Sequence, residues 1–136
     1  MSRDRLYRLP HGHEWSLALL CLAIVEVIVN ILDADADALG PNRHATAYKV
    51  GKAGGLLLTR TLAETEGPYG ITVNAVSPGT LDNSEKQPPL SQIPLGRVGT
   101  PRDLLGAVVY LSGDTASYIT GAHLKVSGGY LIDRSR

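Results

Sequence analysis

The sequence predicts an α/β domain built on a parallel sheet, with helices on both faces. Three segments rich in apolar and β-branched residues, 25–33, 71–79 and 122–129, alternate with two segments of helical pattern, 45–66 and 100–113. Alternation of strand and helix is typical of βαβ units, whose strands run parallel. A length of 136 residues, 43% hydrophobic and 19% charged, indicates one ordinary globular domain.

The N-terminal residues 1–24 are expected to form a tail followed by an apolar segment. Three arginines precede the run SLALLCLAIVEVIVNIL, an order that imitates a secretory signal peptide. No small-residue cleavage site follows it, and Glu26 and Asn30 interrupt the run before the roughly 20 apolar residues of a membrane span. The β-branched stretch VEVIVNILD, residues 25–33, is better interpreted as a buried strand, and we expect no membrane association.

The helix at 45–66 and the strand at 71–79 follow this first strand. The string GPYG ends the helix. Its apolar residues at helical spacing are Val50, Leu56, Leu57, Leu58 and Leu62. The string ITVNAVSPG then predicts a strand that ends in a tight turn.

A long connection, residues 80–99, leads to the second helix and the last strand. It is polar and rich in proline, and connections of this length are usually functional or mobile. The helix is expected to begin with Thr100 as N-cap, Pro101 at the first helical position and Asp103 in the first turn. The string AHLKVSGG, residues 122–129, predicts the third strand.

Charge and cysteine content exclude several classes of partner. The formal charge is zero, the pI is near 6.9, and Lys and Arg are scattered, so nothing indicates a nucleic-acid surface. The single cysteine, Cys21, fits a reducing compartment, and we expect a cytoplasmic protein with a small-molecule substrate.

One helical pair has the residue types of a proton-transfer device. Tyr48 and Lys52 are four residues apart, so they share a helix face that points toward the carboxyl edge of the strand at 25–33. A free phenol has a pKa of about 10, and a nearby ammonium lowers this value by favouring the phenolate. Spacing alone leaves a solvated surface pair as the alternative.

The neighbouring strings decide between these interpretations, because together they resemble a known family. In order, VIVNILD, YKVGKAG, GITVNAVSPG and PLGRVGTPRDLLGAVVYLSGDTASYITGAHLKVSGGYL closely resemble the C-terminal half of the short-chain dehydrogenase/reductase family. The resemblance covers about residues 25–132 and assigns 25–136 to the C-terminal half of such a domain. It implies a Rossmann-type α/β fold and hydride transfer between NAD or NADP, with NADP slightly favoured, and a carbonyl, an alcohol or a pterin-like compound.

The resemblance also implies roles for individual residues. Tyr48 matches the catalytic acid/base, and Lys52 matches the residue that lowers its pKa and binds the nicotinamide ribose. Pro78 and Gly79 match the turn that passes over the nicotinamide. Asn83 stands where the family usually has a threonine contacting the carboxamide.

An aspartate departs from the family pattern at the catalytic serine. The string NILD places Leu32 and Asp33 where a serine pair is expected, which is similar to the pteridine reductase branch, where an aspartate assists proton delivery. The loop to Tyr48 is about two residues longer than in that branch, so simple spacing favours Asp35, and a solvated acidic turn remains an alternative. A calcium loop is excluded, because Ala38 and His44 stand where glycine and glutamate are required. We expect no metal site.

The dinucleotide-binding half of the family is not recognisable in the sequence. No G-x-G-x-x-G or comparable glycine spacing follows a strand, and the 47 residues before Tyr48 are too few for the missing strands. We therefore expect a truncated oxidoreductase, or alternatively an inactive remnant or partner subunit that associates with full-length relatives. A homo-oligomer is also expected, with the helix at 45–66 in the contact and Gly51, Gly54 and Gly55 allowing close approach.

Overall fold

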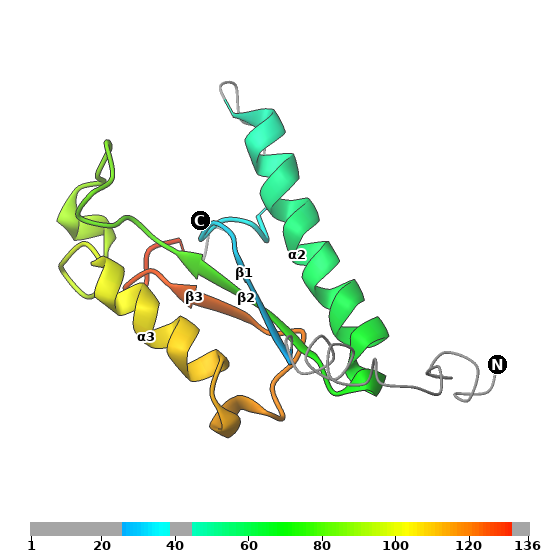
Figure 1. The fold of residues 1–136 in the computed structure, drawn as a ribbon. Helices are drawn as coiled ribbons and strands as arrows, with labels where there is room; N and C mark the ends of the chain where they lie inside the picture. Colours follow the sequence, from blue (N-terminus) through cyan, green and yellow to red (C-terminus); the bar gives the residue numbers. More distant parts are fainter. Residues whose placement is uncertain (1–25, 39–44, 132–136) are drawn as a thin grey trace, which may run out of the picture.

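The fold is a small parallel sheet between two helices. The computed structural model describes residues 26–38 and 45–131. Strands β1 (Val27–Ile31), β2 (Thr72–Pro78) and β3 (His123–Val126) form one parallel sheet in the order β1-β2-β3. Helix α2 (Thr46–Glu66) connects β1 to β2, and α3 (Pro101–Leu111) lies between β2 and β3 in the chain (Figure 1). Three short 3-10 helices complete the described part: η2 (Gly67–Tyr69), η3 (Leu90–Gln92) and η4 (Asp114–Ala116).

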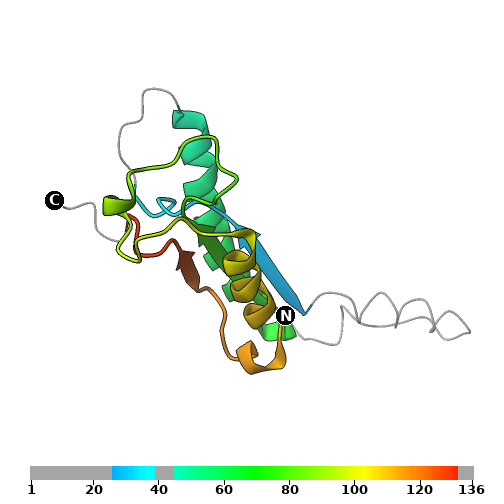
Figure 2. The ribbon, with the colours of Figure 1, turned by 90° about the vertical axis from the view of Figure 1, so that its left-hand side faces the viewer.

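The two α-helices cover opposite faces of the sheet. Side chains alternate along the buried strand β2, so that Ala75 and Val76 face different layers. Ala75 packs with Leu56 of α2, whereas Val76 packs with Leu111 of α3. Figure 2, seen from the side of α3, has the sheet behind this helix and α2 beyond it. The predicted parallel α/β sheet with helices on both faces is confirmed.

Strand β1 is less buried than its sequence predicts. The apolar segment 25–33 predicts a strand buried on both faces, but the residues of β1 are half-buried, and Ile31 is 45% exposed. β1 pairs with β2 on one side and is the first strand in the order of the described sheet. The predicted burial is wrong for the described part of the chain, because an edge position leaves one side of the strand uncovered.

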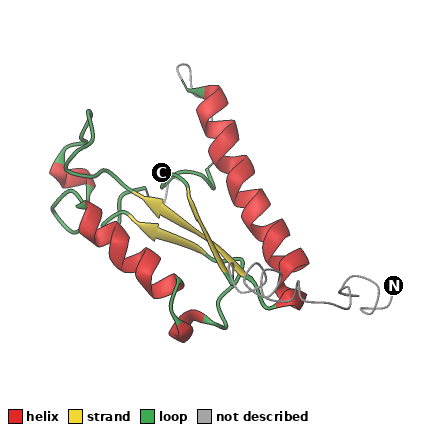
Figure 3. Ribbon diagram, viewed as in Figure 1, coloured by secondary structure: helices red, strands yellow, loops and turns green. Residues whose placement is uncertain are grey.

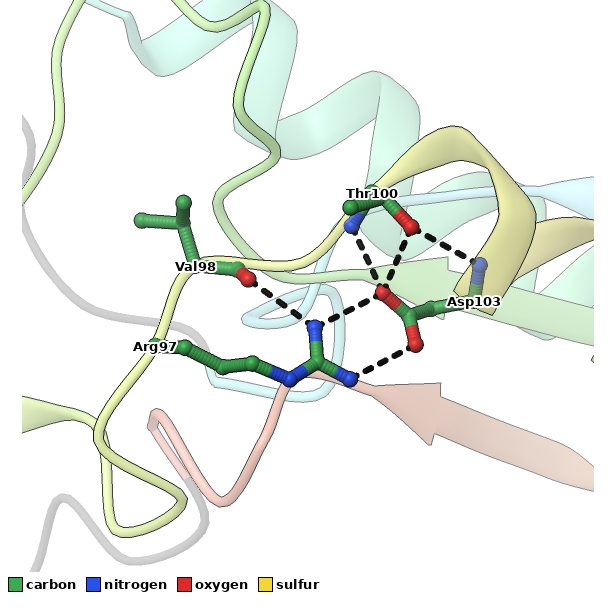
Figure 4. A network of polar contacts seen from close by, with 4 residues as sticks. All are labelled: Arg97, Val98, Thr100 and Asp103. Carbon is green, nitrogen blue, oxygen red and sulfur yellow. Dashed lines mark hydrogen bonds and ion pairs between the residues drawn. The ribbon is translucent and has the colours of Figure 1, made fainter.

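Helix α3 begins as predicted, with a network of polar contacts at its first turn (Figure 4). Thr100 is the N-cap, and its hydroxyl accepts a hydrogen bond from the backbone N–H of Asp103 at 3.3 Å. The Asp103 carboxylate accepts the Thr100 backbone N–H and two N–H groups of Arg97, at 2.8 and 2.9 Å. The Arg97 hydrogen bond, followed by those from Thr100, holds the pKa of Asp103 well below its ordinary range.

The long connection before α3 folds back on itself. Leu81 and Gly99 form an isolated parallel bridge, with hydrogen bonds Asp82 N to Gly99 O at 2.8 Å and Gly99 N to Thr80 O at 2.9 Å. Between them the chain is loop apart from the short turn η3, as Figure 3 shows. Ile93 is 3% exposed and anchors the connection in the interior.

Three features considered from the sequence concern the N-terminal segment, a membrane span and a metal site. Residues 1–24, including Cys21, lie outside the described residues. Within the described ranges, no helix has the length and apolar character needed to cross a bilayer. The same part of the chain holds no group of three or more His, Cys, Asp or Glu side chains placed to share a metal ion.

Candidate active site

The candidate site lies at the carboxyl edge of the sheet. Because the strands are parallel, β1 and β2 end at the same edge, and the backbone joins them there through a hydrogen bond from Leu32 N to Val76 O at 2.9 Å. The segment after β1 begins at this point and continues through residue 38. Loops that follow strands at the carboxyl edge are where open α/β sheets bind ligands.

Helix α2 is fixed against the end of β1 by a small residue and a buried hydroxyl. A Cβ added at Gly55 would lie 2.7 Å from Leu32 Cδ2, so glycine allows the helix to approach closely. Thr59, fully buried, accepts a hydrogen bond from Asn30 Nδ2 at 2.9 Å and donates to Gly55 O at 2.8 Å. These contacts set the rotation of α2 and therefore the direction of the residues one and two turns before Gly55.

Tyr48 and Lys52 are brought to this edge together. The Tyr48 hydroxyl donates to Asp33 Oδ2 at 2.8 Å. Lys52 Nζ donates to the backbone oxygen of Ile31 at 3.2 Å and lies 5.5 Å from the centre of the Tyr48 ring. The two side chains share a helix face and point toward the end of β1, as their spacing predicts.

The pKa of Tyr48 moves in the direction opposite to the one expected. The Tyr48 side chain is 53% exposed, but partial burial, then the hydrogen bond to Asp33 and the charges of Asp33 and Asp35, raise its pKa to about 12. The resemblance implied that Lys52 would lower it. In this structure the ammonium donates a hydrogen bond to a backbone carbonyl, while a carboxylate accepts a hydrogen bond from the phenolic hydroxyl. The phenol is therefore neutral at physiological pH.

The two candidate aspartates have different partners. Asp33 contacts Tyr48, and its other oxygen accepts the backbone N–H of Asp35 at 3.3 Å. Asp35 instead forms an ion pair with Lys49, the residue after Tyr48. The contact with the tyrosine therefore belongs to Asp33 and not to Asp35, which simple spacing favoured.

The predicted turn over the nicotinamide lies at the end of β2, on the side of β3. Pro78 is the last residue of β2, and Gly79 N donates to Val126 O at 2.9 Å. A Cβ at Gly79 would lie 2.8 Å from Ser127 Cα, so only glycine fits there without displacement. Asn83 is exposed in the turn that follows, and within the described residues no hydrogen bond joins it to Tyr48 or Lys52.

A second polar cluster at this edge was not identified in the sequence. Lys125 Nζ donates to Asp37 Oδ1 at 2.8 Å, and His123 Nδ1 lies 3.9 Å from Asp37 Oδ2. Ser77 Oγ is hydrogen-bonded to His123 Nε2 at 2.7 Å. The cluster joins three distant parts of the chain, namely Asp37, Ser77 of β2 and the pair His123 and Lys125 of β3, so no local pattern could indicate it.

An open pocket of about 550 Å³ extends from the carboxyl end of β3 toward α3. Its walls include Leu95, Arg97, Lys125 and the pair Gly128 and Gly129. Tyr48 and Lys52 do not line it. Lys125 contacts Asp37 and so connects this wall to the segment that carries Asp33.

The comparisons with known proteins agree with this architecture. Residues 25–131 match the family model described as enoyl-(acyl carrier protein) reductase. A short chain dehydrogenase from Bacillus anthracis superposes with a TM-score of 0.73 at 33% identity, over 81% of this chain and 46% of that one. The chain belongs to the short-chain dehydrogenase/reductase family.

Curated relatives whose names describe two different enzyme activities are similar in sequence to this chain. An L-rhamnose 1-dehydrogenase (NAD(P)(+)) of Azotobacter vinelandii is 43% identical over 98 residues, which is 65% of this chain and 38% of the relative. A 3-oxoacyl-[acyl-carrier-protein] reductase FabG of Vibrio harveyi is 38% identical over 100 residues, 67% of this chain and 41% of the relative. The chain thus spans about two fifths of the length of these relatives.

Proposed function

We propose that the chain carries the proton-transfer half of an NAD(P)-dependent oxidoreductase. The observation that supports this most strongly is the hydrogen bond from the Tyr48 hydroxyl to Asp33, with the Lys52 ammonium 5.5 Å from the same ring. An acid, the acceptor of its hydrogen bond and a cation at the carboxyl edge of a parallel sheet form a set suited to general acid catalysis.

The residues at this edge fit the nicotinamide end of NADP or NAD. An ammonium has three N–H donors, and Lys52 uses one of them on Ile31, so it can also donate to ribose hydroxyls. Tyr48, the turn at Pro78 and Gly79, and the exposed amide of Asn83 would complete that contact. When bound, the nicotinamide supplies or accepts the hydride. The family resemblance slightly favours NADP.

The protonation state of Tyr48 favours the direction of reduction. With a pKa raised to about 12 by burial and by Asp33, Tyr48 holds its proton at neutral pH and can donate it to a developing alkoxide or amide nitrogen. Asp33 is in position to orient that proton, because it accepts the same O–H. Lys52 lies beside the ring and would stabilise the phenolate left after transfer.

The substrate is proposed to be a small carbonyl compound or a pterin-like imine. The printed names of the relatives describe dehydrogenation of L-rhamnose and reduction of a 3-oxoacyl group on a carrier protein. The contact between Asp33 and Tyr48 instead supports the pterin-like alternative, because it places a carboxylate where the family has a serine. An ionised carboxylate can accept a hydrogen bond from a ring N–H group as well as from a hydroxyl.

Activity can be tested after the chain is joined to the part of the Azotobacter relative that it does not cover, which we expect to bind the dinucleotide. We expect NADPH-dependent reduction of at least one compound in a panel of 3-oxoacyl thioesters, aldoses and dihydropterins. Tyr48→Phe should lower kcat by a factor of about 100 to 10,000, the usual contribution of a general acid. Tyr110→Phe, a change of a half-exposed tyrosine on α3, is the matched control.

The alternative role, an inactive partner subunit, predicts a different result. If the folded fusion and its Tyr48→Phe variant both bind NADPH but reduce nothing in the panel, the role of an inactive partner subunit would be favoured over catalysis. Preference for dihydropterins, lost in Asp33→Ser, would support the pterin-like substrate.

A further inference from the structure

The segment after β1 has an alternating pattern of aspartate and alanine, DADAD, at residues 33–37. Ala34 is 1% exposed and Ala36 is 4% exposed, and Ala36 packs with Leu32 in the core beside α2. Hydrogen bonds from Ala36 N to Asp33 O at 3.0 Å and from Ala38 N to Asp35 O at 2.9 Å form two successive turns. The alanines thus fill the interior, and the aspartates bond to groups outside it.

Each of the three carboxylates bonds to a different group. Asp33 accepts the Tyr48 hydroxyl, Asp35 is paired with Lys49, and Asp37 is paired with Lys125. Tyr48 and Lys49 are consecutive on α2, whereas Lys125 belongs to β3. The segment is therefore tied to the helix that carries the proposed acid and, independently, to the last strand.

We infer that Lys49 is a positioning residue, whose ion pair with Asp35 holds the segment in the register that places Asp33 against Tyr48. This inference rests on the proposed function of Asp33 and Tyr48 as a proton-transfer pair. Alternate residues of the segment contact consecutive residues of α2, so a shift of one residue along the helix would break both contacts. Lys49 thus acts through Asp35 on the hydrogen bond between Tyr48 and Asp33, which Lys49 does not itself make.

The burial of the pair supports this role. The side chains of Lys49 and Asp35 are 16% and 12% exposed, so solvent screens their attraction less than in a surface ion pair. The second tie, Lys125 with Asp37, is more open, at 20% and 41%. Partial burial acts to raise the pKa of Asp37, but the hydrogen bond and charge of Lys125 lower it below its ordinary value. We assign this pair a weaker effect on register.

Positioning and simple electrostatics predict opposite effects when Lys49 is neutralised. Among the described residues, the charged groups near the Tyr48 side chain are Asp33 and Asp35 from the segment and Lys52 from α2. If Lys49 mattered only as a charge, its removal would take a positive charge away from the surroundings of Tyr48 and would make Tyr48 harder to ionise. If Lys49 positions the segment, its removal separates Asp33 from Tyr48 and makes Tyr48 easier to ionise.

The experiment is an NMR measurement on the 136-residue chain labelled with ¹³C at tyrosine Cζ, without cofactor or substrate. Tyr48→Phe assigns the resonance, and Asp33→Asn gives its position when the carboxylate is lost. Near pH 7.5, where lysines are charged, Lys49→Met should move the Tyr48 signal most of the way to the Asp33→Asn position. Near pH 10, where an ordinary tyrosine is about half ionised, the wild-type residue should remain neutral and the variant should ionise.

Controls separate this effect from general destabilisation. Lys49→Arg should restore the wild-type signal, Lys125→Met should shift it less, and Lys86→Met, at an exposed loop position, should leave it unchanged. If Lys49→Met does not fold, Lys49→Gln, which keeps more of the polar character, gives the same comparison. A Tyr48 signal that stays in place, or that shows ionisation at a higher pH than in the wild type, would overturn the inference. Since no ligand is present, this result is independent of the activity test.

Discussion

At the scale of single residues, His123 shows how burial can outweigh a neighbouring charge. Its side chain is 9% exposed, and Ser77, fully buried on β2, is hydrogen-bonded to Nε2 at 2.7 Å. Burial lowers the pKa of His123 although the charge of Asp37, 3.9 Å away, opposes this effect. Ser77, His123 and Asp37 follow one another as in a catalytic triad. Ser77 is nevertheless not a nucleophile, because its fully buried hydroxyl cannot reach a substrate.

The lowered pKa of His123 predicts a pH-dependent stability. The unfolded chain binds a proton near the ordinary value of 6.5, whereas the folded chain binds it only at lower pH. The free energy of unfolding should therefore decrease as the pH falls below about 6.5, and Asp37 should add its own loss only at more acidic pH. Urea unfolding of the wild type and of His123→Gln between about pH 7.5 and 5.5 measures this. Equal slopes against pH in the two proteins would contradict it.

The sequence predicted which side chains meet at the site better than it predicted their ionisation. The spacing of Tyr48 and Lys52 on one helix face is local, and so their common direction followed from the pattern. The pKa of Tyr48 depends on where Asp33 points after β1 ends, and the contact of Lys49 with Asp35 depends on the same turn. Neither is encoded in a local spacing, and the resemblance could not supply them because it implies a serine, and not an aspartate, after the first strand.

At the scale of elements, helix α2 has two distinct faces. Its inner face carries Leu56, Thr59 and Ala63, which are buried. Its outer face carries Val50, Leu57 and Leu58, which are 62%, 67% and 53% exposed. Of the three glycines predicted to allow close approach of another helix, Gly51 and Gly54 are open, but Gly55 is in contact with Leu32 of the same chain. That part of the prediction is corrected, because Gly55 serves packing within the chain.

The outer face of α2 predicts self-association. Val50, Gly54, Leu57 and Leu58 lie at positions i, i+4, i+7 and i+8, which form one stripe on a helix. We expect dimers or larger assemblies at about micromolar concentration, and the double variant Leu57→Glu/Leu58→Glu should be monomeric in sedimentation. Leu95→Glu, in the connection before α3, is the control and should not change the mass, although Leu95 is 71% exposed. A folded wild-type monomer under these conditions would refute the association.

The order and type of the elements followed from the sequence, but the shape of the long connection did not. The cap at Thr100 and the periodicity of the helices are local signals, and both are confirmed. The bridge between Leu81 and Gly99 uses backbone groups, so the polar and proline-rich composition of residues 80–99 carried no sign of it. Ile93 is the one buried large apolar residue there, and its isolation in the sequence gave no periodicity to interpret.

At the scale of the whole molecule, the central strand of the described sheet is the most buried. The residues of β2 from Val73 to Ser77 are buried, whereas β1 at the edge is half-buried. The site is built on the loops that follow β1 and β2, together with α2, and these elements pack against one another through Leu32, Leu56 and Ala75. The residues proposed for proton transfer therefore have a structural support of their own within the described part of the chain.

The same architecture predicts weak cofactor binding by the 136-residue polypeptide alone. The described site offers Tyr48, Lys52 and the turn at Pro78 to the nicotinamide end, but the sequence lacks a glycine-rich turn at a helix N-terminus to bind the pyrophosphate. Most polar groups of the cofactor would then remain in water, and we expect a dissociation constant for NADPH of about 1 mM or weaker. Fluorescence or calorimetric titration of the isolated chain measures it, with the dinucleotide-half fusion as positive control. Saturable binding in the micromolar range would mean that the polypeptide holds a phosphate site outside the glycine pattern, and the division of labour proposed for the two halves would have to be abandoned.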